Sequence, residues 1–277
     1  MSISSTIPPY VVLHKKRGET PLETLEAWKS QHSALAGIPT SYAGRLDPMA
    51  EGKLLVLLGD ECKKQDQYTK LDKEYEIEVL LDMKTDTGDV LGIGEYGGKV
   101  TFPDRAALRP VLSHELGPRS HRYPIFSSKT VNGKPLFLYA LEGTLSEITI
   151  PEHIETIYRI IHENSYRLST IELKKRLDEL LAHIPRSDEP SKILGADFRQ
   201  DAVRARWNEI FKTLPNRQFE ILKLRVICAS GSYMRTLAER IGTSLGTTGL
   251  ALSINRTKIG KFTSLGPVNF WSKQYTA

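Results

Sequence analysis

The chain has 277 residues, of which 40% are hydrophobic, so it can bury a sizeable core as one large domain or two small ones. Its net charge of +5 is compatible with a polyanionic partner but does not identify one. Two distant cysteines lack metal-ligand spacing, and no apolar stretch suits a signal peptide or a membrane span, which argues against a disulfide framework and predicts a metal-free protein of the cytoplasm outside any membrane.

The first predicted elements are a strand and a capped helix. Residues 10–15 favour a strand, which leads into a glycine turn. Thr20 and Glu23 then form a capping box with Pro21 at the first helical position, so a helix should begin there. Its apolar face is expected to comprise Leu22, Leu25 and Trp28.

Asp47 follows this helix in the segment 44–59, GRLDPMAEGKLLVLLG. Burying an ionised carboxylate is costly unless a partner offsets the cost, so this acid is either a local turn former or a group retained for chemistry. Asp before Pro is common in turns, which makes the structural interpretation the first to consider.

Strand signals recur along the rest of the chain. In residues 74–81, EYEIEVLL, alternation places three apolar side chains on one face, namely Tyr75, Ile77 and Val79. Tyr75 either packs in the core or stacks on a flat ligand such as a nucleobase. Further strand signals occupy residues 97–102, 156–163, 219–230 and 257–265. With helices between them, these segments predict an α+β fold around a mixed sheet.

Two amphipathic segments interrupt this pattern, at residues 172–184 and 202–214. Apolar side chains recur in them at helical spacing: Leu173, Leu177, Leu180, Leu181 and Ile184 in the first, and Val203, Trp207, Ile210, Phe211 and Leu214 in the second. The stretch between them, residues 185–196, is rich in Pro, Ser and charge and is typical of a loop. We therefore expect a helical hairpin, at about residues 165–215, inserted before the strand at Phe219.

Three further segments offer side chains for chemistry. Arg235 opens a helix after a small-residue turn, and its planar fork either pairs with a buried carboxylate or caps a surface turn. Residues 85–89, TDTGD, hold two acids but ordinarily form a hairpin connection. Lys129 and Lys134 alternate with aromatics in a loop, a pattern compatible with gripping a phosphate backbone and also with any basic surface loop.

Six blocks of the sequence, taken in order, carry a family resemblance. They are LHKKRG, GRLDPMAEGKLLVLLGDECKK, KEYEIEVLLDMKTDTGD, YPIFSSKTVNGKPLFLYALEG, CASGSYMRTLAERIG and LSINRTKIGKFT. Together they resemble the catalytic domain of the TruB family of tRNA pseudouridine synthases over most of residues 10–143 and 218–265. The resemblance implies the pseudouridine synthase fold, with a central mixed, largely antiparallel sheet flanked by helices and loops. It also implies an isomerase that detaches uracil from ribose and rejoins it through carbon, without metal, nucleotide or redox cofactor.

The resemblance also assigns roles to residues. The catalytic aspartate falls on Asp47, the base-stacking tyrosine on Tyr75, and the arginine paired with the aspartate on Arg235. Asp47 would then lie in an apolar pocket, kept ionised by Arg235, and act as nucleophile or as base. The expected substrate-binding residues are Tyr42, Ile254, Lys15, Lys129 and Lys134. Tyr42 stands where the family commonly has histidine and Ile254 where it has leucine, while His121 and Tyr123 replace the Gln and first Pro of the family's loop motif.

Domain organisation and partner follow from the same resemblance. Residues 1–277 are expected to form a single catalytic domain that includes the helical insertion, and the short tail after residue 265 leaves no room for the family's C-terminal PUA domain. The expected partner is the T arm of tRNA, with its uridine at position 55, bound by a monomer without a small-molecule cofactor. The insertion either adds RNA contacts or is a structural decoration. Its candidate contacts are Arg199, Arg204, Arg206 and Lys212.

Rival functions come from several classes. GRLD followed by EG also resembles the RsuA and RluA families, which act on ribosomal RNA, although TDTGD and the YPIFSS loop argue against them. A guide-RNA-dependent relative of the Cbf5 type shares the core but normally carries the PUA domain. An RNA-binding folding helper without catalysis is opposed by the intact Asp47, Tyr75 and Arg235. A glycoside hydrolase using Asp47 with Asp86 or Asp89 is the remote alternative.

Overall fold

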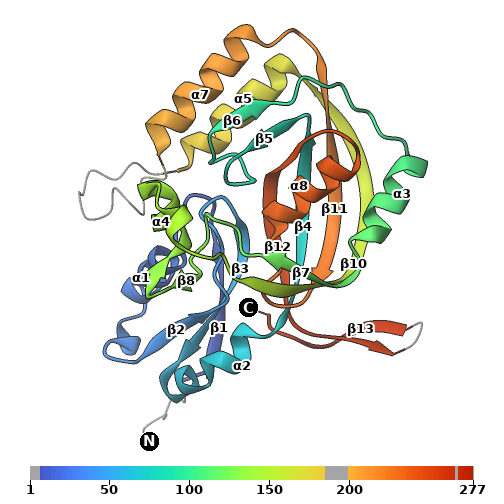
Figure 1. Ribbon diagram of the computed structural model, residues 1–277. Coiled ribbons are helices and arrows are strands. Elements are labelled where there is room, and N and C mark those ends of the chain that lie inside the picture. The colour runs from blue at the N-terminus through green and yellow to red at the C-terminus, as the bar shows by residue number, and fades with distance from the viewer. Residues whose placement is uncertain (1–6, 185–198, 266–267, 277) are drawn as a thin grey trace, which may run out of the picture.

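The computed structural model describes residues 7–184, 199–265 and 268–276, and the loop predicted at 185–196 lies outside these ranges (Figure 1). Within them, nine strands form one sheet in the order β1-β3-β12-β4-β11-β10-β7, with β2 added to β3 and β13 to β12. The strands of the sheet are β1 (Tyr10–Lys15), β2 (Thr40–Ala43), β3 (Glu51–Leu58), β4 (Asp72–Leu81), β7 (Gly117–Arg122), β10 (Glu152–Ser169), β11 (Gln218–Cys228), β12 (Gly249–Leu265) and β13 (Val268–Gln274).

Pairing in this sheet is antiparallel except between β3 and β12, where Asn255 lies opposite Glu51 and Arg256 opposite Gly52. The expected mixed, largely antiparallel sheet is therefore confirmed. Two small hairpins, β5 (Met83–Thr85) with β6 (Gly94–Tyr96) and β8 (Thr130–Val131) with β9 (Lys134–Pro135), stand beside it. The α-helices of the described ranges are α1 (Pro21–Ser30), α2 (Gln65–Thr69), α3 (Arg105–His114), α4 (Leu136–Glu142), α5 (Thr170–Ala182), α7 (Gln200–Thr213) and α8 (Met234–Ser244).

Local sequence signals determine the start of α1. The predicted capping box between Thr20 and Glu23 is present, and the helix begins at Pro21. Leu25 is buried as expected, and Trp28 packs beside it. Leu22 was expected on the same face, but it is 51% exposed because it lies in the first turn, at the rim of a surface hollow.

The main core lies between the sheet and the helices α5, α7 and α8 (Figure 1). Tyr75, Ile77 and Val79 of β4 are all buried in it, as the alternation predicts. The strand predicted at 97–102 is absent, since these residues run irregularly after β6. Their backbone groups bond to side chains instead: Thr101 N–H donates to Asp82, and the Lys99 carbonyl accepts from Arg217.

The helical insertion is present between β10 and β11, where α5 and α7 lie side by side (Figure 1). It begins later than predicted, because residues 165–169 extend β10 and pair with β11. Ser169 then caps α5 through a capping box with Glu172. The predicted apolar positions of α5 are buried, and in α7 Val203, Trp207 and Ile210 are buried while Phe211 and Leu214 are partly buried. Among the described helices, none is long and apolar enough to cross a membrane.

Candidate active site

Asp47 lies in the turn that joins β2 to β3, where Ala50 N–H donates to its backbone carbonyl at 3.0 Å. The turn forms one wall of a cavity of about 230 Å³. The side chains that line this cavity include Asp47, Tyr75, Ile254, Tyr233, Ser127 and Arg256. The Asp47 side chain is 42% exposed, so it stands at the cavity mouth rather than in the enclosed apolar setting that the resemblance implies.

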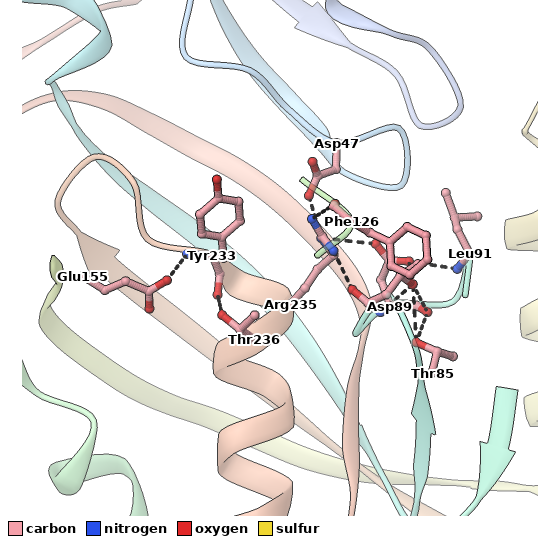
Figure 2. Close-up of polar contacts among 10 residues, drawn as sticks. Asp47, Thr85, Asp89, Leu91, Phe126, Glu155, Tyr233, Arg235 and Thr236 are labelled. Carbon is pink, nitrogen blue, oxygen red and sulfur yellow. Dashed lines mark hydrogen bonds and ion pairs between the residues drawn. The ribbon is translucent and has the colours of Figure 1, made fainter. Parts of the chain in front are cut away.

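Arg235, at the start of α8, is the ionic partner of Asp47 (Figure 2). Its Nε donates to Asp47 Oδ2 at 2.7 Å, and only 3% of its side chain is exposed. Its two terminal nitrogens donate to backbone carbonyls, Nη1 to Thr87 at 2.5 Å and Nη2 to Phe126 at 3.1 Å. The guanidinium therefore joins three separate segments of the chain and does not bind the carboxylate with both arms of its fork.

Asp89 is a second carboxylate beside the same guanidinium, and its Oδ2 lies 3.5 Å from Arg235 Nε. It is almost fully buried, and its Oδ1 accepts from Leu91 N–H and from the Thr87 hydroxyl, each at 2.9 Å. Burial raises the pKa of Asp89 to about 6, although Arg235 opposes this shift. Burial alone would lower the pKa of Arg235, but the carboxylates of Asp47 and Asp89 together raise it above the ordinary value.

The TDTGD segment thus forms the expected hairpin connection and also contributes to the site. Gly88 has a φ of +76°, and a Cβ there would lie 2.9 Å from Glu239 Oε1 and 3.2 Å from Arg235 Cβ, so only glycine lets the turn pack against α8. Asp86 points elsewhere and pairs with Arg199. With Asp86 in another ion pair and Asp89 enclosed behind Arg235, neither acid is placed to work with Asp47 on a sugar, which opposes the glycoside hydrolase alternative.

Two buried cations, Lys15 and Arg256, donate hydrogen bonds to backbone carbonyls in and beside the Asp47 turn. Lys15 is fully buried, and its Nζ donates to the carbonyls of Ala50 at 2.6 Å, Lys16 at 3.0 Å and Pro48 at 3.4 Å. Burial lowers its pKa from 10.5 to about 8. Lys15 was predicted to bind substrate, and this stays a prediction; in the structure its buried amine binds the backbone carbonyls of the Asp47 turn.

Arg256 supports the other end of the turn and is 1% exposed. It donates to the carbonyls of Lys53 at 2.7 Å, Gly44 at 3.0 Å and Arg45 at 3.4 Å. Gly52 permits this arrangement, because its φ is +109° and a Cβ there would lie 2.4 Å from the Arg256 carbonyl oxygen. Sequence reasoning singled out neither Arg256 nor Gly52, because a basic side chain whose partners are backbone carbonyls leaves no pattern in the sequence.

Tyr75 and Ile254 lie on neighbouring strands, β4 and β12, and line the same cavity as Asp47. Both are buried, and burial raises the pKa of the Tyr75 phenol. Tyr42 lies outside this cavity, on β2, where it lines an adjoining hollow of about 340 Å³. The two spaces share Gly44, Arg45 and Thr69 as lining residues, so they form neighbouring compartments.

The loop that carries Lys129 and Lys134 borders the cavity through Ser127 and Ser128. Lys129 Nζ lies 5.1 Å from the centre of the Tyr123 ring. Lys134 forms an ion pair with Glu142, so a phosphate would have to compete with that carboxylate. Across the described ranges, no three His, Cys, Asp or Glu side chains gather closely enough to hold a metal ion.

The cations proposed for the insertion are also largely engaged within the protein. Arg199 pairs with Asp86, Arg204 donates to the Leu181 carbonyl, and Arg206 binds the Gly94 carbonyl and Glu209. Lys212 is exposed at the end of α7. This arrangement favours a structural role for the first three arginines over RNA contact.

The fold is shared with a solved structure. A chain of a Cbf5-Nop10-Gar1 complex superposes with a TM-score of 0.51 and 17% identity, over 91% of this chain and 48% of that one. That similarity shows the pseudouridine synthase fold, in agreement with the α+β architecture of this chain.

Sequence comparison adds relatives. The protein named tRNA pseudouridine synthase B from Nitrosomonas europaea is 30% identical, over 82% of this chain and 58% of its own length. Those from Hydrogenovibrio crunogenus and Aromatoleum aromaticum are 29% and 28% identical, each over 91% of this chain and over 65% and 63% of their own lengths. The chain thus spans less than two thirds of the length of these relatives. The family model described as TruB family pseudouridylate synthase (N terminal domain) matches residues 39–177, half of the chain. The protein therefore belongs to the TruB family of pseudouridylate synthases.

Proposed function

We propose that the protein isomerises uridine to pseudouridine in tRNA, at position 55 of the T loop. The observation that carries this proposal is the ion pair between Asp47 and the buried Arg235 at the mouth of a cavity lined by Tyr75 and Ile254. The names of the family relatives, tRNA pseudouridine synthase B, support tRNA as the substrate class. We further propose that it acts as a monomer in the cytoplasm and binds the T arm.

A uridine that is stacked in RNA cannot reach this cavity, so the base has to flip out of its stack. That step costs roughly a few kcal/mol, which stacking on Tyr75 and contacts with the RNA backbone would offset. Lys129, in the loop that borders the cavity, would contact the RNA backbone, whereas Lys134 would first have to break its ion pair with Glu142. The apolar side chain of Ile254 would close the cavity against the uracil.

The reaction breaks the bond between ribose C1′ and uracil N1 and forms one between C1′ and C5, after which C5 loses its proton and N1 gains one. The Asp47 side chain is 42% exposed and therefore accessible to the ribose, and its carboxylate, which is paired with Arg235, acts as nucleophile or as base. No atoms are gained or lost overall, so the isomerisation consumes no second substrate.

The test is to incubate the protein with unmodified tRNA transcripts and to map new pseudouridines by sequencing after carbodiimide treatment. The proposal predicts one new pseudouridine, in the T loop, and none with Asp47→Asn. Modification of ribosomal RNA fragments in place of tRNA would favour the RsuA or RluA alternative. RNA refolding without modification by the wild type would favour the folding helper.

A further inference from the structure

Among the described residues of the helical insertion, Arg199, which directly precedes α7, contacts two segments that border the candidate site. Its guanidinium binds Asp86 with both arms, Nη1 to Oδ2 at 2.6 Å and Nη2 to Oδ1 at 3.1 Å. About a quarter of the Arg199 side chain and a third of the Asp86 side chain are exposed, so the pair is shielded from solvent on most sides. A two-armed pair of this kind fixes direction as well as distance.

The same guanidinium lies 4.6 Å from the centre of the Phe126 ring, within range of a cation–π contact. Asp86 immediately precedes Thr87 in the turn after β5, and Phe126 belongs to the loop that follows β7. These two segments supply the backbone carbonyls that accept from Arg235, one from Thr87 and one from Phe126. Arg199 therefore bridges the two segments that hold Arg235.

The rest of α7 strengthens this bridge. Trp207 is almost fully buried, and its indole N–H donates to the Val90 carbonyl at 3.1 Å. Arg206 Nε donates to the Gly94 carbonyl at 3.0 Å. Asp86 Oδ1 also accepts from Ile93 N–H at 2.8 Å, which ties the start of the β5–β6 connection to its end. The insertion thus packs along the hairpin whose turn contacts Arg235.

The position of Arg235 is sensitive to that turn because two carboxylates compete for its Nε. Asp47 Oδ2 is at 2.7 Å and Asp89 Oδ2 at 3.5 Å, so a small shift of the guanidinium would move the contact from one to the other. The two carbonyl groups that accept from the terminal nitrogens determine where the guanidinium lies. A displacement of this order at a reacting group is enough to slow chemistry strongly.

We propose that Arg199 is a positioning residue, which acts through Asp86 and Phe126 to hold Arg235 against Asp47. The insertion would then serve catalysis from outside the cavity, without contact with substrate. This inference rests on the proposed function, since the orientation of Arg235 matters only for the chemistry at Asp47. The competing interpretation is that Arg199 binds an RNA phosphate, and the two interpretations predict different behaviour of conservative variants.

The experiment measures the single-turnover rate of pseudouridine formation and the Kd for tRNA in Arg199→Ala, Arg199→Lys and Asp86→Asn. Lysine keeps the charge but cannot make the two-armed contact, and asparagine keeps the acceptor for Ile93. We expect each variant to lose about tenfold to thirtyfold in rate, with Kd changed by no more than about twofold. Combining Arg199→Ala with Asp86→Asn should cost no more than the worse single change, because both remove one interaction.

The matched control is Lys174→Ala, which removes the cation of an exposed ion pair with Asp178 on the same insertion. It should leave rate and Kd unchanged, and thermal melting of every variant verifies folding. If Arg199→Ala fails to fold, Arg199→Lys and Asp86→Asn still decide the question. A near wild-type Arg199→Lys alongside a weakened Kd in Arg199→Ala would show phosphate binding and overturn the inference. Wild-type rates in all variants would overturn the inference about Arg199 but leave the proposed function intact. An inactive wild-type protein would contradict the proposed function as well.

Discussion

Replacing Lys15 by methionine separates support of the Asp47 turn from contact with RNA. Methionine has a similar length but donates no hydrogen bond, so the carbonyls of Ala50, Lys16 and Pro48 would lose their donor. We expect the turn to become less well fixed and the single-turnover rate to fall about tenfold. The Kd for tRNA should change by no more than about twofold, because the buried amine cannot reach a phosphate.

The expected change in the free energy of unfolding follows from the lowered pKa of Lys15. The native amine titrates at about 8 and the unfolded one at 10.5, so between these values the unfolded chain binds the extra proton. Stability therefore rises with pH in this window, by at most about 1.4 kcal/mol per pH unit. The contribution from Lys15 amounts to about 2 kcal/mol between pH 8 and 10. The variant lacks this contribution.

The assay is urea unfolding of wild type and Lys15→Met at several pH values from 7.5 to 10. Subtracting the two free energies of unfolding cancels every other titration, so the advantage of the wild type should grow by about 2 kcal/mol across the window. Lys16→Met, an exposed neighbour, is the control and should give a constant difference. Parallel curves for wild type and Lys15→Met, or a large loss of RNA affinity without loss of rate, would refute this reasoning.

Three further substitutions test the site. Arg235→Lys should lower the single-turnover rate by about a hundredfold or more, because one ammonium cannot serve Asp47 and two carbonyls in the same geometry; a rate within threefold of wild type would contradict this. Gly52→Ala should lower the free energy of urea unfolding by about 2–4 kcal/mol, since its Cβ would meet the backbone of Arg256; an unchanged midpoint would show that the strands can separate without cost. Tyr75→Leu should reduce kcat/KM about tenfold to hundredfold through lost base stacking, and equal kinetics would remove Tyr75 from the site.

Local patterns were sufficient to predict the elements that depend on local interactions. The capping box at Thr20 and the alternation around Ile77 each involve residues within one turn or one strand, and both elements are found as expected. The strand predicted at 97–102 fails for the complementary reason. Its β-forming residues are outweighed by hydrogen bonds to Asp82 and Arg217, which come from distant segments of the chain.

The geometry of the candidate site depends on contacts between residues that are far apart in the sequence. Asp47 and Arg235 are 188 positions apart, so no periodicity connects them, and only the family resemblance paired them. The burial of Lys15 and Arg256 could not be predicted, because their partners are backbone carbonyls that any sequence provides. Asp89 was considered as part of a hairpin turn or as the acid of a glycoside hydrolase, and its burial beside Arg235 could not be predicted because it requires α8 to pack against that turn.

The central claim is that Asp47 drives isomerisation of uridine in tRNA, and release of tritium from a transcript labelled at uridine C5 tests it most directly. Joining ribose to C5 expels the hydrogen from that carbon, so each isomerised uridine frees one tritium. We expect the wild type to release up to one equivalent per tRNA, and Asp47→Asn to be slower by about a thousandfold or more with Kd within about tenfold of wild type. Release at the wild-type rate by Asp47→Asn, or none by the wild type, would contradict the account.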